Sequence, residues 1–359
     1  MTMCPESSPI SSRKPSPLRN GVTGAVLSSV LIPSLIIVGL SAAPLPAQKT
    51  FADIASADRA LADDAPAYRA LQEGRVGDAA TLLSATLAAH PSDATAHQLL
   101  CRVAYAQNQA DAAVTQCELA VADDPSNSDH QLWLGRAYGM KARRAGPIAG
   151  FRLARKVQAS FARAVDLNPN NVAALNDLGE YYVAAPSIVG GGNDKARALA
   201  ARIMPHFPAA AHRLLARSAE AQNDLATAES QFKQAVAVQQ ASDAWIDLAQ
   251  FYENHGRGDE ALAAVKSGIA ADRAHDAALV DAAGVLTAAH RAPDLAERCL
   301  RDYLASRATS DAAPVFKVHL QLSRLLTARG DTAGAHKEID TATALAPAFT
   351  RSARSVRGS

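Results

Sequence analysis

The sequence predicts an all-α solenoid of stacked antiparallel helix pairs, and three observations lead to this. Pro91 and Pro125 stand 34 residues apart in similar surroundings, and Pro169 follows in a third such frame. A fixed period in this range is typical of repeat architectures. The chain is 48% hydrophobic but only 5% aromatic, so alanine, the strongest helix former, carries much of its apolar content. Such a chain builds its core between neighbouring repeats.

When the segments are aligned on their prolines, they share a pattern of small and large residues. Small residues at the eighth, twentieth and twenty-seventh positions let two helices pack closely, and larger residues fill the gaps between them. Gly74, Gly256 and Gly330 fall where the first helix turns into the second, and glycine adopts positive φ there at little cost. A proline after the second helix ends it. The predicted units are 60–93, 94–127, 128–171, 172–208, 209–241, 242–275, 276–310 and 316–349.

These residues resemble the tetratricopeptide repeat (TPR) family over residues 60–349. Leu132–Tyr138 and Trp245–Tyr252 match the family's first helix well. The resemblance implies a right-handed superhelix whose first helices line a concave groove. The residues expected to face this groove are Gln98, Arg102, Tyr105, Trp133, Arg136, Asn176, Asp177, Glu180, Gln250 and Glu253. Trp133 is the expected anchor, because desolvated Trp and Arg dominate interface energetics, although each of these residues also fits an ordinary exposed helix position.

Residues 1–47 have the pattern of a secretory signal. Basic residues precede an apolar run over about 22–40, and small residues follow it. Cleavage is expected after Ala47, which leaves a linker over 48–59, and a disordered basic tail is expected over 350–359. The protein would then be periplasmic or secreted. The alternative is an uncleaved membrane anchor, because the apolar run can span a bilayer when tilted; membrane contact is expected only in that case.

Two units exceed the period, and both extra stretches fall between the two helices of their unit. Residues 140–156 carry six positive charges and no negative charge. They could form a basic lip for an acidic partner, lipid headgroups or a polyanion. The favoured alternative is longer helices with solvated Lys and Arg, and with Ile148 and Phe151 packed into the array.

The second extra stretch, residues 185–195, is rich in glycine. It lacks the pattern of a phosphate-binding loop. The favoured interpretation is a loop that needs glycine dihedrals, with Asn193 or Asp194 capping the following helix.

Three cysteines follow the predicted signal. Cys101 and Cys117 stand at the eighth and twenty-fourth positions of one unit, and their midpoint lies in the turn between the helices. They should therefore face each other at similar height. A disulfide is expected there in an oxidising compartment, with two buried thiols as the alternative. Cys299 has no obvious partner and is expected to be a buried thiol.

No catalytic motif is recognised. The ten histidines are scattered, and neither a zinc-protease helix motif nor a nucleophile elbow is present. A net charge of +1 gives no general nucleic-acid signal. The expected protein is therefore a non-catalytic scaffold without cofactor or metal, which binds a protein or peptide. The alternatives are a structural subunit of an envelope assembly, acting through its convex surface or Cys299, and a polyanion or small-molecule binder that uses the basic insertion.

Overall fold

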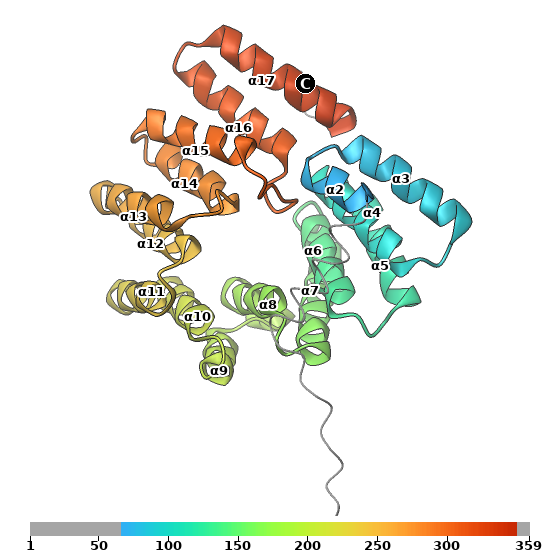
Figure 1. Cartoon of the computed structure of the whole chain (residues 1–359). Coiled ribbons are helices and arrows are strands. Elements are labelled where there is room, and N and C mark those ends of the chain that lie inside the picture. Colours follow the sequence, from blue (N-terminus) through green and yellow to red (C-terminus); the bar gives the residue numbers. More distant parts are fainter. Residues whose placement is uncertain (1–65, 350–359) are drawn as a thin grey trace, which may run out of the picture. The chain divides into compact units, whose positions relative to one another are not determined.

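In a computed structural model of the protein, the described residues are 66–349, within one compact unit, Lys49–Ser359. These described residues form helices and no strand. Figure 1 shows the helices stacked as successive pairs. The prediction of an all-α solenoid of antiparallel helix pairs is confirmed. The predicted signal peptide, linker and basic tail lie outside the described residues.

Eight helix pairs follow one another over residues 66–349. The first helices are α2 (Pro66–Gln72), α4 (Ala94–Ala106), α6 (Ser128–Ala142), α8 (Val172–Ala184), α10 (Pro208–Ala221), α12 (Ser242–Asn254), α14 (Ala277–Ala288) and α16 (Val315–Ala328). The second helices are α3 (Val76–Ala89), α5 (Ala110–Asp123), α7 (Pro147–Leu167), α9 (Asn193–Ile203), α11 (Leu225–Gln239), α13 (Gly258–Ala271), α15 (Pro293–Ala305) and α17 (Thr332–Leu345). A short 3-10 helix, η1 (Ser187–Val189), precedes α9.

Most turns between the two helices of a pair contain a residue with positive φ. Gly74, Gly256 and Gly330 have φ of +75°, +71° and +84°, so their predicted role is confirmed. Asn108 and Asn223 take the same conformation at the equivalent turns, because asparagine tolerates it better than most residues. The shared feature of these turns is therefore the left-handed backbone conformation, which either glycine or asparagine can adopt.

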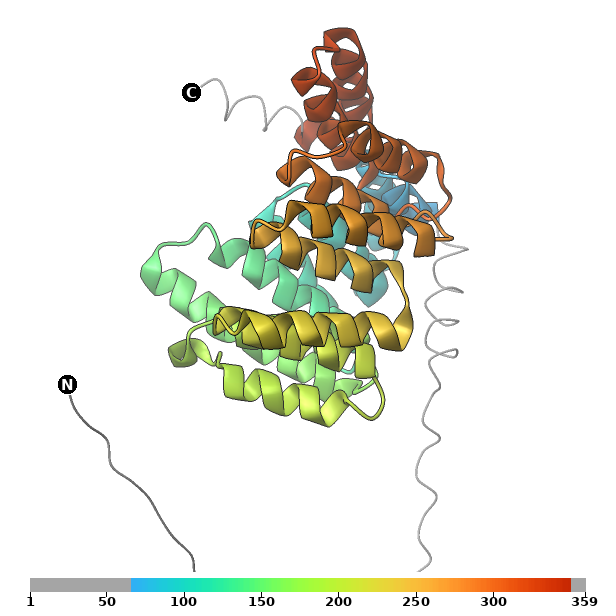
Figure 2. The same ribbon diagram turned by 90° about the vertical axis from the view of Figure 1, so that its left-hand side faces the viewer.

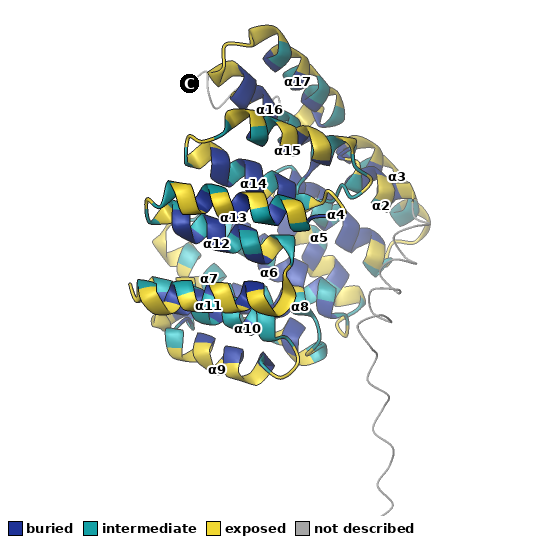
Figure 3. Ribbon diagram, turned by 60° about the vertical axis from the view of Figure 1, so that its left-hand side comes forward, coloured by how far each residue is buried: buried dark blue, intermediate teal, exposed yellow. Residues whose placement is uncertain are grey.

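Small residues at the eighth position bring the two helices of a pair into close contact. A Cβ added to Gly135 of α6 would lie 2.5 Å from the ring of Phe161 in α7. At the same position of the next unit, a Cβ at Gly179 of α8 would lie 2.9 Å from Leu214 of α10, so there the small residue brings two successive first helices together. Figure 3 shows the result, with buried residues between the helices and exposed residues on their outer faces.

This close contact predicts opposite effects for two glycines of α6. Gly135→Ala is expected to lower the free energy of unfolding by roughly 1–3 kcal/mol, because the Phe161 ring has to move. Gly139 is the matched control, since its nearest neighbour would be Val157 Cγ2 at 3.9 Å. Gly139→Ala should gain up to about 1 kcal/mol of helix propensity. Urea unfolding of both variants measures the difference, and equal stabilities would contradict the packing described.

Both long insertions are ordered. The expected longer helices are present, since α6 continues to Ala142 and α7 runs for 21 residues. However, Ile148 is 75% exposed and Phe151 is 38% exposed. The prediction that they pack into the array is therefore wrong. Both lie on the face of α7 that is opposite to its buried residues, such as Val157.

The glycine-rich stretch also differs in part from its prediction. Gly190 and Gly192 have φ of +100° and +138°, as a loop that needs glycine dihedrals requires. A side chain at Gly191 would collide with the Ala185 carbonyl oxygen. The expected cap is absent, because α9 follows Gly192 without a side-chain cap. Asp194 instead forms an ion pair with Arg197, three residues further along α9.

The predicted disulfide is confirmed. Cys101 of α4 and Cys117 of α5 are bonded, with their Cα atoms 5.2 Å apart and a sequence separation of 16. Both cysteines are fully buried, so the bond fastens the second helix pair from within. Cys299 is a free, buried thiol, and burial, with a contribution from Asp302, raises its pKa to about 11.

The first and last helix pairs pack against each other (Figure 1). Leu71 of α2, Phe316 of α16 and Ala342 of α17 belong to one buried apolar cluster. Gly74 lies so close to α16 that an added Cβ would be 2.9 Å from Val315 Cβ. The series of pairs therefore closes on itself, and its two ends share a core.

Candidate functional site on the concave face

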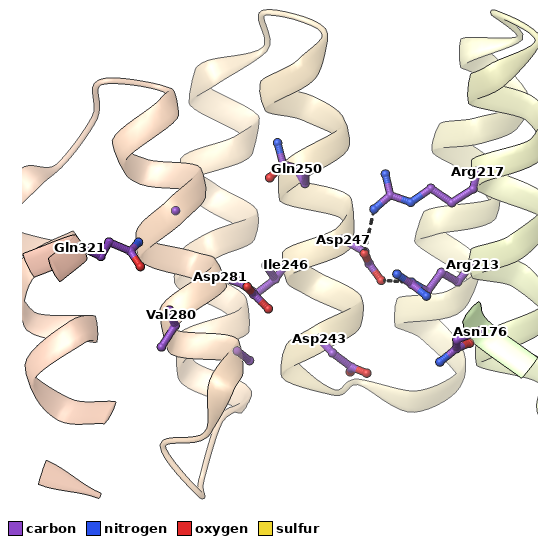
Figure 4. Close-up of a pocket in the computed structure, with 12 residues that line it drawn as sticks. Asn176, Arg213, Arg217, Asp243, Ile246, Asp247, Gln250, Val280, Asp281 and Gln321 are labelled. Carbon is purple, nitrogen blue, oxygen red and sulfur yellow. Dashed lines mark hydrogen bonds and ion pairs between the residues drawn. The ribbon is translucent and has the colours of Figure 1, made fainter. Parts of the chain in front are cut away.

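An open cavity of about 600 Å³ lies along the first helices of five successive pairs, from α8 to α16. Figure 1 shows these helices on the inner side of the array, with the second helices α9 to α15 outside them. The cavity is lined by Asn176, Arg213, Arg217, Asp243, Ile246, Asp247, Gln250, Ala278, Val280, Asp281, Gly284 and Gln321. Figure 4 shows side chains from neighbouring helices directed into this space.

The repeat places these side chains in the cavity. Most of them stand at the second, fifth, sixth or ninth position of their unit, a spacing that puts them on one face of a helix. In α12 this face carries Asp243, Ile246, Asp247 and Gln250. The remaining face of α12 is buried against its neighbours and includes Ala249, with no exposed surface. Because the small residues lie on the buried face of each first helix, the polar residues on its other face point into the cavity.

Both arginines of the cavity are held in ion pairs. Arg213 donates from Nε to Asp247 at 2.6 Å, and Arg217 donates to the same carboxylate at 3.1 Å. Glu180 lies 3.3 Å from Arg213. Burial lowers the pKa of Arg213, but the carboxylates of Asp247 and Glu180 outweigh this and raise the pKa above its ordinary value. These cations are therefore neutralised within the protein.

Two carboxylates of the cavity have no ion pair among the described residues, Asp243 and Asp281. Asp243 accepts a hydrogen bond from the Ala244 backbone N–H at 2.8 Å, and its negative charge adds to the raised pKa of Arg213. Solvent reaches Asp281, but the surrounding protein reduces its hydration. This desolvation, together with the negative charges of Asp247 and Asp276, raises the pKa of the Asp281 carboxyl. The α12–α14 side of the cavity therefore carries uncompensated negative charge.

A second group of predicted groove residues lies near the contact between the two ends of the array. These residues interact with other residues of the protein. Arg102 donates two hydrogen bonds to Asp311, at 2.7 and 2.9 Å. Its guanidinium also lies 4.9 Å from the ring centre of Tyr68 and 5.0 Å from that of Trp133. Asp311 follows α15, so this interaction links the second pair to the end of the array.

Trp133 stands at the centre of this group and is only 9% exposed. Arg136 lies 4.7 Å from its ring centre and donates to Asp177 at 2.6 Å. Tyr105 meets the Trp133 ring edge-on at 5.5 Å. Gln98 is also buried. A partner-binding role for these residues stays a prediction, because the structure shows their contacts with one another.

The remaining predicted residues lie at or beside the cavity. Asn176 and Gln250 line it. Glu180 pairs with Arg213 and Arg217. Glu253 accepts a hydrogen bond from Gln250 Nε2 at 2.9 Å. The structure thus brings Asn176, Glu180 and Gln250 together around one space.

Five residues of the cavity are not among the predicted groove residues: Arg213, Arg217, Asp243, Asp247 and Asp281. The predicted residues stand at the fifth, sixth, ninth and twelfth positions of four units. Asp243 stands at a second position, Asp247 is an unselected sixth position, and no predicted residue lies in the units that start at 209 and 276. The same count gives Arg213 and Arg217 in the first of these units and Asp281 in the second.

A smaller apolar cavity of about 460 Å³ lies on the other side of α12, between α11 and α13. Trp245, Leu248 and Val236 line it. Residues 66–349 contain no cluster of three or more His, Cys, Asp or Glu side chains suited to a metal ion. A search of the same residues finds no helix with the length and apolar character of a membrane span.

Two protein-family models match the chain. The general tetratricopeptide repeat model matches residues 70–138, and the model of the middle TPR-like domain of cilia and flagella-associated protein 70 matches residues 212–344. A search of curated proteins finds no match.

Among solved structures, a TPR protein of Thermus thermophilus, TTC0263, is 22% identical, with 64% of this chain and 92% of that chain covered and a TM-score of 0.37. Yeast Tom70 is 15% identical, with 82% and 63% covered and a TM-score of 0.48. A Parabacteroides merdae TPR protein is 13% identical, with 72% and 96% covered and a TM-score of 0.43.

The two family models agree with the proline period, the left-handed turns and the close glycine contacts described above. They match two different parts of one array of eight helix pairs. The chain belongs to the tetratricopeptide repeat family.

Proposed function

We propose that the protein is a non-catalytic scaffold that binds an extended segment of another protein in the concave cavity. We further propose that a Lys or Arg of that segment sits between Asp243 and Asp281. The observation that carries the proposal is the charge distribution. The cavity's own cations are paired, while these two carboxylates form no ion pair among the described residues.

The remaining lining suits a peptide with a long basic side chain. Ile246 and Val280 lie beside the free carboxylates (Figure 4), and the aliphatic stem of Lys or Arg packs well on such surface. The amides of Asn176, Gln250 and Gln321 can donate to and accept from a peptide backbone. An acidic peptide side chain would instead have to displace Asp247 from two arginines.

The chemistry of the lining also supports binding rather than catalysis. The described residues that line the cavity include no Ser, Cys or His, so they supply no Ser–His or Cys–His pair for nucleophilic catalysis. Proteins of this family are generally scaffolds. The disulfide and the predicted signal together support export to an oxidising compartment as part of the proposal.

The proposal predicts a defined effect of Asp281→Asn. Peptides selected from a random library by the wild-type chain should be enriched in Lys or Arg. Asp281→Asn should weaken their binding by roughly tenfold, because a charge-assisted hydrogen bond contributes about 1.5–3 kcal/mol and part of it survives through Asp243. Fluorescence anisotropy with the selected peptides measures this, and Asp340→Asn on the exposed face of α17 is the matched control.

The same carboxyl gives binding a pH dependence of known sign. Because the pKa of Asp281 is raised in the free protein, it protonates at a higher pH than an ordinary Asp as the solution is acidified. A cationic ligand prefers the ionised form, so affinity should fall through that range in the wild type and much less in Asp281→Asn. Selection of peptides without basic residues, or equal binding by the two Asp→Asn variants, would contradict the proposed site.

A further inference from the structure

The corner between α6 and α7 projects from the array. In Figure 2 this green corner reaches further to the left than the neighbouring helices. It exists because the third unit is longer than the period: α6 ends at Ala142 and α7 begins at Pro147. The extra helical turns carry side chains beyond the shorter neighbouring pairs.

The exposed face of this corner is both apolar and basic. Ile148, Phe151, Arg152 and Arg155 follow one another at helical spacing on α7, so they share one face. All four side chains are exposed, and Ile148 is exposed to 75%. The buried face of α7 lies on the other side of the helix. The corner therefore presents an amphipathic surface with no cover among the described residues.

The charges of the corner fall into two groups. Lys141 pairs with Asp111 at 2.7 Å, and Lys156 lies 3.6 Å from Glu118. By contrast, Arg143, Arg152 and Arg155 are exposed, and residues 66–349 supply none of them with an ion pair or side-chain hydrogen bond. Because residues 140–156 include no acidic side chain, these three positive charges are available to a partner.

The second long insertion lies against the first. The Tyr181 hydroxyl lies 2.8 Å from the carbonyl oxygens of Ala154 in α7 and Val189 in η1. Val189 is buried there, whereas its neighbour Ile188 is 73% exposed. Because η1 packs against α7 near Ala154, about 9 Å along the helix from Ile148, Ile188 adds a third exposed apolar side chain near this corner.

We propose that this corner, defined by Arg143, Ile148, Phe151, Arg152, Arg155 and Ile188, docks the protein on the surface of an anionic lipid bilayer. Basic residues beside exposed apolar side chains are typical of segments that lie in the membrane interface. The arginines meet lipid phosphates, and the three apolar side chains enter the headgroup boundary. A soluble polyanion would use the arginines and leave the apolar side chains in water, which is why the combination favours a bilayer.

This docking leaves the concave cavity free, and it is independent of the predicted N-terminal signal. The test is sedimentation of the full-length chain with vesicles of phosphatidylcholine alone or of an equimolar mixture with phosphatidylglycerol. Three unpaired arginines should raise partitioning onto the anionic vesicles on the order of 100-fold. Substitution of all three by Gln should remove most of this gain. The matched control is a triple Gln variant at Arg202, Arg273 and Arg298, which has the same net charge.

A second variant, Ile148→Ser/Phe151→Ser/Ile188→Ser, separates a bilayer from a polyanion. It should lose at least tenfold in vesicle binding, because three apolar side chains no longer enter the interface. Val238→Ser, at an exposed apolar site on α11, should leave vesicle binding unchanged. In addition, Phe151→Trp should become quenched by brominated lipid. If the Ser variant binds vesicles as the wild type does, or if both Gln variants lose equally, the proposal is overturned.

Discussion

Arg102→Ala is expected to lower the free energy of unfolding by about 3–5 kcal/mol, because it leaves a buried carboxylate without its cation. The Asp311 side chain is only 10% exposed and accepts both guanidinium hydrogen bonds. The variant also loses the stacking of the guanidinium on Tyr68 and Trp133. Since Arg102 and Asp311 join the second pair to the far end of the array, the loss should appear first as separation of the two ends.

Denaturant unfolding measures the stability loss, and a pair of spin labels on exposed sites of α3 and α17 measures the distance between the ends. Arg301→Ala is the matched control, because its side chain is 49% exposed, pairs with Glu297 within α15 and lies 3.6 Å from Glu338 of α17; loss of this exposed cation should cost less than about 1 kcal/mol. Arg102→Ala/Asp311→Ala should be less destabilised than the two single losses added together. An Arg102→Ala protein as stable as Arg301→Ala would show that the closure does not depend on this pair.

Loss of the disulfide should cost about 2–4 kcal/mol, because the unfolded chain regains freedom over a short loop. The variant is Cys101→Ala/Cys117→Ala, which removes the bond between α4 and α5. The expected result is a lower midpoint of thermal unfolding that no longer responds to reductant. The wild type should approach the same midpoint once it is reduced.

Cys299→Ala is the control for this experiment. It removes the free buried thiol and keeps the disulfide, so its midpoint should still fall on addition of reductant. If reductant does not lower the wild-type midpoint, and the double variant is as stable as the wild type, the disulfide does not stabilise the protein.

The sequence predicts the architecture well because the repeat states the same information several times. Pro91, Pro125 and Pro169 each stand two residues beyond the end of a second helix, and the Cys101–Cys117 pair follows from position within one unit. Pro208 differs, since it is the first residue of α10. Proline is tolerated there because its missing N–H has no helical partner to lose.

The candidate site is less predictable, because it depends on contacts between units. Position within a unit shows that Arg136 and Arg213 face inward, but not that each one finds an acidic partner on the next first helix. Likewise, nothing local to Arg102 indicates a partner 209 residues away. The curvature that closes the array arises from many small packing angles, so the residual charge at Asp243 and Asp281 becomes visible only in three dimensions.

Site-specific photocrosslinking shows whether a partner segment lies in the concave cavity. A benzoylphenylalanine placed at Gln321 reports on the cavity, and one placed at Val238 reports on the exposed face of α11. Peptides selected by the wild-type chain should crosslink from position 321 and not from position 238, and Asp281→Asn should reduce the yield. Crosslinking from position 238 alone, or a yield at position 321 that Asp281→Asn leaves unchanged, would contradict peptide binding in the cavity beside Asp281.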